Sequence, residues 1–373
     1  MNGRRPVRGW VAATLIAAAL LTGPVAPGSA AAPRAVGAAA ATPSVATLTH
    51  LIGQRLMVAM NGTTPSPALL GRISRGEVGG VILFGANVTT RSALVALTTK
   101  LHAAATAAGQ PRLLIAVDQE GGAIKRIPWA PPTLSPPQMG ELASAATARA
   151  QGLATGKALK ALGIDVDLAP IADVPTSTAS FEYRQHRTWS FFVTRTAGLA
   201  VAFAQGLRAG GVIPVLKHFP GLGTSTRNTD TTVVTIWRTQ AALASGLAPF
   251  RAAIRAGLPV MMLSNATYPA WDAHLAAGWS TAINTALLRT QLGFRGVTIT
   301  DSLDGTAAAR GLTSSYLAER AAGAGSDLIL LTGSEASSAT AFTALLHDAE
   351  TGKLPLAGLQ ASDRRIEALK HTG

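Results

Sequence analysis

Eight short apolar segments, each followed by a helical pattern, constrain the fold of this chain more than any other feature. They are rich in Val, Ile and Leu and lack a strict polar–apolar alternation, which is typical of parallel strands buried on both faces. The segments cover residues 56–60, 80–84, 113–118, 164–170, 212–219, 260–265, 296–301 and 327–332. Amphipathic stretches that predict helices lie between them, among them residues 91–107, 194–208, 239–255 and 281–292.

Eight such alternations predict an α/β fold of one domain, the (β/α)8 or TIM barrel. The alternative is a doubly wound open sheet. Its nucleotide-binding version is disfavoured, because no Gly-x-Gly-x-x-Gly follows the first strand and no Walker A sequence occurs. We expect the barrel domain to cover residues 46–373.

The N-terminus has the composition of an export signal. Residues 1–31 carry three arginines, then an apolar stretch over 10–21, then small residues, and this layout predicts a secretory signal peptide. The apolar stretch is short for a membrane span, although an uncleaved anchor is the alternative. Residues 32–45 are rich in Ala and Pro and predict a linker. We therefore expect the protein to be secreted or to remain in the cell envelope.

Composition excludes several classes of protein. The absence of cysteine rules out disulfide scaffolds, thiolate metal sites and a cysteine nucleophile. The net charge of +13 comes from basic residues that are scattered singly, so we expect no nucleic-acid binding. Electrostatic association with an anionic cell envelope agrees better with this charge.

Polar residues gather where the predicted strands end. Asp118, the pair Lys217–His218, Asn265 and Asp301 each close an apolar segment, and catalytic groups of a barrel lie at that end of its strands. Each residue alone could be a buried structural group, but together they predict one polar pocket. A single His at a strand end disfavours a His-rich metal site. Carboxylates among basic groups suit sugar binding and glycoside hydrolysis.

Five motifs in order carry a family resemblance: GGVILFGANV at 79–88, AVDQEGGAIKR at 116–126, LGIDVDLAPIADV at 162–174, KHFPGLG at 217–223 and GFRGVTITDSL at 293–303. Across roughly residues 48–335 the chain resembles family 3 glycoside hydrolases of the single-barrel β-N-acetylhexosaminidase type. The resemblance implies a retaining enzyme that releases non-reducing terminal β-linked N-acetylglucosamine from cell-wall or chitin-type saccharides. It implies no metal or organic cofactor, and we expect a monomer.

The resemblance also assigns roles to residues. Asp301 is implied to be the nucleophile, and Asp118 to hold hydroxyls of the terminal sugar. One further arginine of the family best matches Arg187, with Arg184 as the alternative. The other implied sugar contacts are Arg126, Lys217 and His218.

One segment departs from the family pattern. After the fifth strand the family has KHFPGHG and then Asp-Ser-His, whose His is the general acid and base. Here Leu222 replaces one His, and the triplet is Asn228-Thr229-Asp230. Asp230 can supply the acid if its pKa is raised; otherwise only substrates with good leaving groups would react. A sugar-binding pseudoenzyme and a β-glucosidase of the same family are the alternative functions.

Overall fold

The computed structural model describes residue 23 and residues 43–372. Apart from residue 23, the predicted signal peptide lies outside the described residues, as does most of the predicted linker. The first described helix, α1 (Val45–Gly53), begins at the last residue of that linker. The hydroxyl of Ser44 accepts a hydrogen bond from the backbone N–H of Thr47 at 3.1 Å, which caps the helix at its start.

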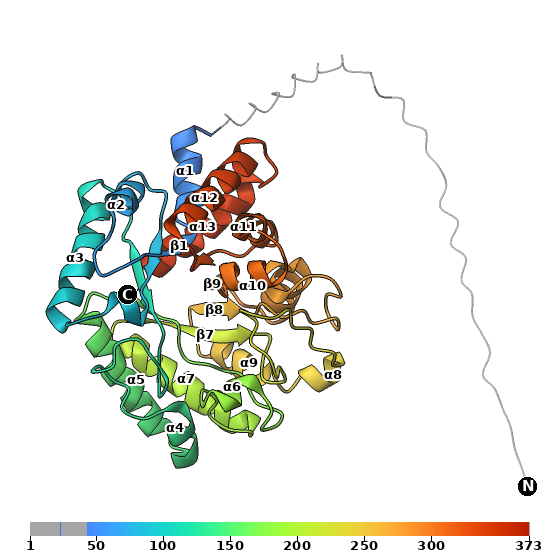
Figure 1. The fold of residues 1–373 in the computed structure, drawn as a ribbon. Helices are drawn as coiled ribbons and strands as arrows, with labels where there is room; N and C mark the ends of the chain where they lie inside the picture. The colour runs from blue at the N-terminus through green and yellow to red at the C-terminus, as the bar shows by residue number, and fades with distance from the viewer. Residues whose placement is uncertain (1–22, 24–42, 373) are drawn as a thin grey trace, which may run out of the picture. The chain divides into compact units, whose positions relative to one another are not determined.

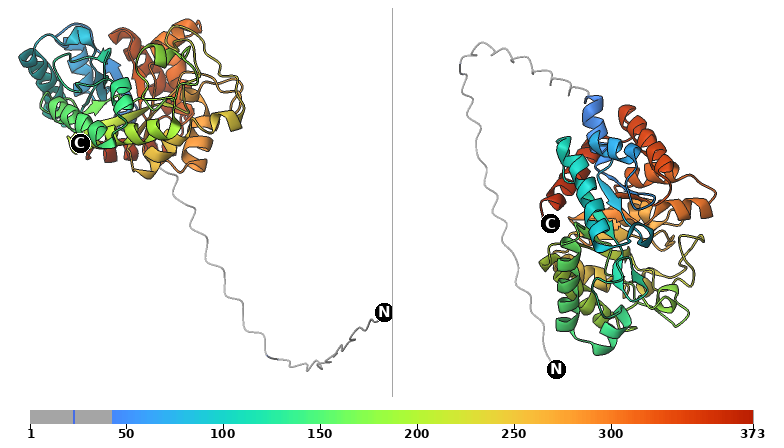
Figure 2. Two further views of the ribbon diagram at one scale, coloured as in Figure 1. Left: turned by 90° about the horizontal axis from the view of Figure 1, so that it is seen from below. Right: turned by 60° about the vertical axis from the view of Figure 1, so that its left-hand side comes forward.

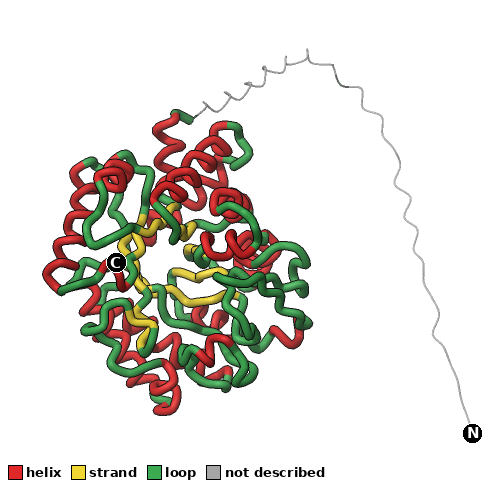
Figure 3. The backbone as a smooth tube through the Cα atoms, in the orientation of Figure 1, coloured by secondary structure: helices red, strands yellow, loops and turns green. Residues whose placement is uncertain are grey.

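Eight parallel strands form the centre of the fold, and each lies within one of the eight predicted segments. Their order around the sheet is β10-β1-β2-β3-β6-β7-β8-β9, and an isolated parallel bridge between Ile299 and Leu328 joins the two ends. The prediction of a (β/α)8 barrel is thus confirmed, and Figures 1 and 3 show the strands ringed by helices. The strands are β1 (Leu56–Ala59), β2 (Gly80–Ile82), β3 (Leu114–Val117), β6 (Val166–Asp167), β7 (Ile213–Phe219), β8 (Val260–Leu263), β9 (Val297–Thr300) and β10 (Ile329–Leu331).

The outer layer consists of helices that follow the strands (Figure 2). The longer ones are α2 (Pro67–Ser74), α3 (Arg91–Ala107), α5 (Ala145–Lys160), α7 (Val193–Ala209), α9 (Ala248–Arg255), the π-helical η3 (Ala282–Gln291), α11 (Ser314–Gly323), α12 (Glu335–Glu350) and α13 (Leu356–Lys370). Shorter ones are η1 (Gly85–Asn87), α4 (Pro136–Leu142), α6 (Phe181–Arg184), α8 (Gln240–Leu243), η2 (Ala277–Trp279) and α10 (Leu303–Ala309). Among the described residues, no helix is both long and apolar enough to span a membrane.

The prediction of one continuous helix over residues 239–255 was wrong. The segment 239–255 is not a single helix but two, α8 and α9, separated by residues 244–247. Pro249 lies in the first turn of α9, where its missing N–H and fixed φ are tolerated, whereas both would disrupt a helix interior. The helix therefore stops and begins again ahead of this proline.

The barrel interior is apolar and closed at one end. Alternate strand residues such as Met57, Val215 and Ile299 fill it, and Ile366 and Leu369 of α13 belong to the same buried cluster. Because α13 packs at the amino end of the strands, polar groups are free to gather at the carboxyl end, where the connecting loops lie.

Candidate active site

The seven residues to which the sequence analysis assigned catalytic or sugar-binding roles line a single pocket with a cavity volume of about 390 Å³. The pocket lies at the carboxyl ends of the strands: Asp118 directly follows β3, Lys217 and His218 lie in β7, and Asp301 directly follows β9. The seven are Asp118, Arg126, Arg187, Lys217, His218, Asp230 and Asp301.

Lys217 is the centre of a chain of buried charges. Its ammonium lies 2.7 Å from Asp118 Oδ1 and 2.7 Å from Glu120 Oε1, and its side chain is almost fully buried. Burial opposes the charge on Lys217, but the two carboxylates outweigh it and raise its pKa. Lys217 therefore remains an ammonium that fixes the position of the Asp118 carboxylate.

Arg126 reaches the same carboxylate from a tight hairpin. Strands β4 (Gln119–Gly121) and β5 (Ile124–Lys125) are antiparallel, and Gly121 and Gly122 have φ values of 103° and 60°, which a residue with a Cβ rarely adopts. The turn brings the Arg126 guanidinium to 3.7 Å from Asp118 Oδ2. This guanidinium also lies 5.6 Å from the centre of the Phe84 ring, so it is held on two sides.

Arg187, rather than Arg184, enters the pocket. It donates two hydrogen bonds to Glu120, at 2.9 and 2.7 Å, and a third to Glu182. Burial opposes the charge of Glu120, but Arg187 and Lys217 more than compensate and hold its pKa well below the usual range. Arg184 is directed elsewhere, because its guanidinium donates to the Thr226 carbonyl at 2.7 Å.

His218 is backed by a buried carboxylate. Its Nδ1 lies 2.7 Å from Asp173 Oδ2, and Asp173 Oδ1 accepts from the backbone N–H of Leu222 at 2.6 Å. Burial lowers the pKa of His218, but Asp173 overcomes this and raises it. With Nδ1 committed to Asp173, Nε2 has no protein partner among the described residues and is available to the pocket.

Asp301 follows strand β9 directly. Its backbone N–H donates to the Leu263 carbonyl at 3.0 Å, which extends the β8–β9 pairing to this residue. Its Oδ1 accepts from the N–H of Ser302 at 2.8 Å. Asn265, which the sequence placed at a strand end, does not line the pocket but donates to the Ser302 carbonyl at 2.6 Å. The nucleophile candidate is thus on a supported backbone, with its carboxylate half-buried.

Asp230 faces the pocket from the loop after β7. Asn228 Oδ1 accepts from the Asp230 N–H at 2.9 Å, a local turn typical of Asn. Asp230 as a residue is exposed, but its carboxyl group lines the pocket, where neighbouring protein partly buries it. This burial and the nearby charge of Asp301 raise the pKa of Asp230 to about 7. A carboxyl with this pKa is about half protonated at pH 7 and mostly protonated below it.

The sequence did not indicate three carboxyl groups of this region as site residues. Glu182 lines the pocket and binds Arg187; Asp173 orients His218. Asp167 ends strand β6, and burial raises its pKa to about 8. Asp173 follows a predicted apolar strand by three residues, which is a signal that could have been used. Glu182 has no such signal.

The described residues hold one group of three potential metal ligands, and it lies outside this pocket. His50, Asp363 and Glu367 meet between α1 and α13, where the His50 ring lies 3.4 Å from Asp363 Oδ1. The pocket itself contains one His and several carboxylates already paired with Lys217 and Arg187. Its chemistry is therefore that of acid–base groups and anion–cation pairs.

The family model described as "Glycosyl hydrolase family 3 N terminal domain" matches residues 47–369. The chain belongs to glycosyl hydrolase family 3. Within that family, this hydrolase is 34% identical to a β-hexosaminidase of Nitrosomonas eutropha, over 74% of this chain and 80% of the relative. It is also 33% identical to an uncharacterized secreted glycosyl hydrolase of Arthroderma benhamiae, over 89% of this chain and 96% of the relative.

Solved structures agree with this assignment. The family 3 hydrolase matches the crystal structure of a β-N-acetylhexosaminidase from Beutenbergia cavernae with a TM-score of 0.80 and 34% identity, over 87% of this chain and 98% of that one. A family 3 β-N-acetylglucosaminidase from Paenibacillus gives a TM-score of 0.82 at 29% identity, over 87% and 62% of the two chains. The protein is a glycosidase of the β-N-acetylhexosaminidase-like type.

Proposed function

We propose that the protein is an exported, retaining exo-β-N-acetylglucosaminidase in which Asp301 is the nucleophile and Asp230 replaces the missing acid–base histidine. The observation that carries this proposal is that the Asp230 and Asp301 carboxyl groups line one pocket. Asp230 has a pKa raised to about 7 by burial and by the charge of Asp301. One protonated and one ionised carboxyl are what a retaining glycosidase requires.

In the first step the Asp301 carboxylate attacks C1 of the terminal sugar. The bond from C1 to the glycosidic oxygen breaks, and that oxygen takes the proton of Asp230, so the leaving saccharide departs as a neutral alcohol. Asp301 is then esterified to the sugar and Asp230 is a carboxylate. In the second step Asp230 takes a proton from water, the water oxygen bonds to C1, and the Asp301 carboxylate is released.

The remaining pocket residues supply sugar binding. Asp118, held by Lys217 and Arg126, offers carboxylate oxygens to sugar hydroxyls, while His218 offers Nε2. Arg187 is neutralised by Glu120 and Glu182, so it orders the pocket wall more than it attracts an anion. Preference for N-acetylglucosamine is supported by the name of the Paenibacillus β-N-acetylglucosaminidase. Export is supported by residues 1–31 and by the word "secreted" in the name of the Arthroderma relative.

The test uses residues 32–373 with two substrates. One is 4-nitrophenyl-β-N-acetylglucosaminide, whose leaving group needs little protonation; the other is N,N′-diacetylchitobiose, whose leaving group needs it. Wild type should hydrolyse both, and Asp301→Ala should hydrolyse neither. For Asp230→Ala, kcat/KM should fall about 10²–10⁴-fold on the disaccharide and much less on the activated substrate. The first sugar released should be the β-anomer by proton NMR.

Other outcomes identify the alternatives. Binding of N-acetylglucosamine by calorimetry, with no turnover of either substrate, would identify a sugar-binding pseudoenzyme. Faster turnover of the matching 4-nitrophenyl glucoside would identify a β-glucosidase. Equal activity of Asp230→Ala and wild type on the disaccharide would remove Asp230 from the mechanism.

A further inference from the structure

A second cavity, with a volume of about 460 Å³, lies on the same loop that carries Asp230. It is lined by residues 224–227 and 233–238, whereas residues 228–230 between these two stretches line the active-site pocket. We propose that this cavity is a leaving-group subsite for an acidic saccharide, whose ring stacks on Trp237 and whose carboxylate binds Arg227 and Arg238. The proposal rests on the proposed function, because it names the leaving group of that reaction.

The position of Asp230 indicates the direction in which the leaving saccharide extends from the active-site pocket. A general acid must lie within hydrogen-bond reach of the glycosidic oxygen, so the leaving saccharide begins next to Asp230. Asp230 belongs to the loop between β7 and α8 (Figure 1), and that loop contributes lining residues to both cavities. Arg227 of the second cavity and Asn228 of the active-site pocket are consecutive residues, so a saccharide that extends past Asp230 along this loop is directed toward the second cavity.

The lining residues suit a sugar that carries negative charge. Trp237 is 78% exposed, and such an indole offers a flat apolar face with its N–H free. The side chains of Arg227 and Arg238 make no hydrogen bond or ion pair with any residue that the structure describes. All ten lining residues are apolar, hydroxyl-bearing or basic, so no carboxylate within the cavity neutralises the two arginines. A ligand carboxylate can accept paired hydrogen bonds from such guanidinium groups.

The cavity walls are held in place before any ligand arrives. On one side the Ser225 carbonyl accepts from the Phe181 N–H at 2.7 Å, and the Thr226 carbonyl accepts from Arg184 at 2.7 Å. On the other side the Ile236 N–H donates to the Thr267 carbonyl at 2.9 Å. Binding to a preformed cavity avoids the free-energy cost of ordering a loop.

The test compares two disaccharides that share their terminal sugar. One is N-acetylglucosamine β-1,4-linked to glucuronic acid, and the other is N,N′-diacetylchitobiose, which lacks the carboxylate. We expect wild type to have the higher kcat/KM on the acidic disaccharide. In the double variant Arg227→Gln/Arg238→Gln, kcat/KM should fall about tenfold or more on that substrate. It should change little on diacetylchitobiose or 4-nitrophenyl-β-N-acetylglucosaminide. Trp237→Ala should lower kcat/KM for both disaccharides.

Two control variants test whether loss of any exposed aromatic ring or any arginine would have the same effect on kcat/KM. Phe192, also exposed (64%), and Arg251 on α9 do not line the cavity; Phe192→Ala and Arg251→Gln should leave all three substrates unchanged. Thermal unfolding of each variant checks that the fold is retained.

Direct binding keeps this test independent of turnover. Calorimetry with the Asp301→Ala variant, with and without the two arginine changes, measures the dissociation constant of the acidic disaccharide. If no substrate is hydrolysed by wild type, the proposed function fails, but an arginine-dependent dissociation constant still supports the subsite. Equal dissociation constants with and without Arg227 and Arg238 would overturn the subsite even in an active enzyme.

Discussion

In the proposed mechanism, Asp230 takes the role of a histidine and has a pKa in a similar range. Imidazole has an ordinary pKa of about 6.5, and the pocket raises the pKa of Asp230 to about 7, by burial first and the charge of Asp301 second. The proton is therefore available over a similar pH range. The charge differs, because a histidine acid is a cation that becomes neutral, whereas this carboxyl is neutral and becomes an anion.

Hydrolysis of diacetylchitobiose should fall as the pH rises through about 7. Asp230 must be protonated to act as the acid, and a group with a raised pKa holds its proton only below that pKa. A profile of kcat/KM against pH for wild type and Asp230→Asn measures this. The basic limb should be present in wild type and absent from the residual activity of the variant. A limb that persists in Asp230→Asn would assign the titration to another group, such as His218.

Asp173→Asn should lower the pKa of the His218 ring. Burial already opposes protonation of this ring, and Asp173 is the charge that overcomes it. Because the folded pKa of His218 is raised, the stability it contributes is present at low pH and is lost as the pH rises through that pKa. NMR titration of the ring should show the downward shift, and the acid-side stability of the variant should fall. An unchanged titration would show that Asp173 does not control this ring.

At this scale the sequence identified polar residues that directly follow a buried strand or lie among its last residues. Asp118, Lys217 and Asp301 are polar groups at the ends of apolar runs, and such positions face the loops of a barrel. Arg187 and Arg184 could not be distinguished in this way, because they are three residues apart and only the fold directs one to Glu120 and the other to Thr226.

At the scale of elements, the loop that carries Asp230 packs on helix α10, which begins two residues after Asp301. A Cβ placed on Gly305 would lie 2.5 Å from the backbone oxygen of Asp230. This backbone atom cannot move away as a flexible side chain could, so Gly305 sets how closely the Asp230 loop approaches the helix that follows Asp301.

Gly305→Ala should therefore reduce activity on the disaccharide by about 10²-fold, since catalytic groups tolerate displacement of about 1 Å poorly. Activity on 4-nitrophenyl-β-N-acetylglucosaminide should fall much less, because that leaving group needs little acid. Gly198→Ala on α7 is the matched control, since a Cβ there meets nothing within 4 Å. It should raise the free energy of unfolding by about 0.5–1 kcal/mol without changing kinetics. Equal losses on both substrates in Gly305→Ala would point to a general structural effect.

Elements differed in how well the sequence predicted them. The eight strands were predictable because burial on both faces produces continuous apolar runs. The β4–β5 hairpin, with the polar residues Gln119, Glu120 and Lys125, has no such run, and its pairing depends on two glycines with positive φ. The division between α8 and α9 was missed although Pro249 indicated it.

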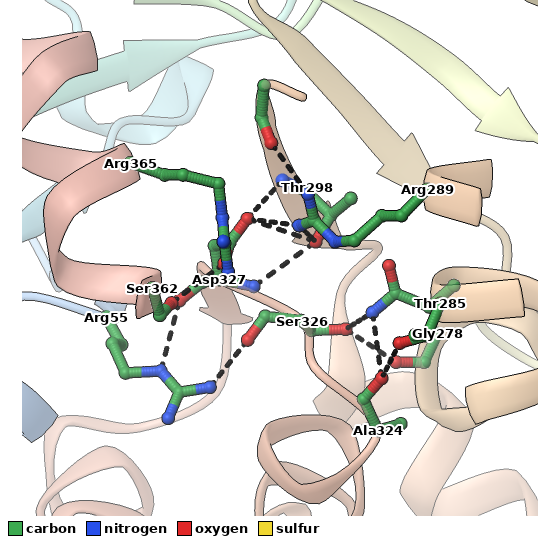
Figure 4. A network of polar contacts seen from close by, with 12 residues as sticks. Arg55, Gly278, Thr285, Arg289, Thr298, Ala324, Ser326, Asp327, Ser362 and Arg365 are labelled. Atoms are coloured by element: carbon green, nitrogen blue, oxygen red, sulfur yellow. Dashed lines mark hydrogen bonds and ion pairs between the residues drawn. The ribbon is translucent and has the colours of Figure 1, made fainter. Parts of the chain in front are cut away.

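At the scale of the whole molecule, a polar network holds the amino end of the barrel together (Figure 4). Asp327 is fully buried ahead of β10 and forms ion pairs with Arg289 at 2.5 Å and Arg365 at 2.6 Å. It also accepts from the N–H of Thr298 on β9 at 2.9 Å. One carboxylate thus links the helical layer to the closing strands.

Asp327→Asn should lower the free energy of unfolding by about 3–5 kcal/mol, because removing one partner leaves the arginines without their charge partner in a buried site. The urea midpoint measures the loss. Since this network lies at the opposite end of the strands from the pocket, kcat/KM per folded molecule should stay unchanged. A variant that keeps its stability but loses activity would contradict this separation of stability from catalysis.

The pairing of β1 with β10 has a consequence for the order in which the protein can fold. Strand β1 comes first from the ribosome, but its second neighbour, β10, and the helix α13 that covers the barrel floor are made last. Until residues 329–370 emerge, one edge of β1 is unpaired. The inward-facing side chains of the other strands also lack the α13 residues that cover them. The barrel of a growing chain therefore cannot close until nearly all of the chain has been synthesised.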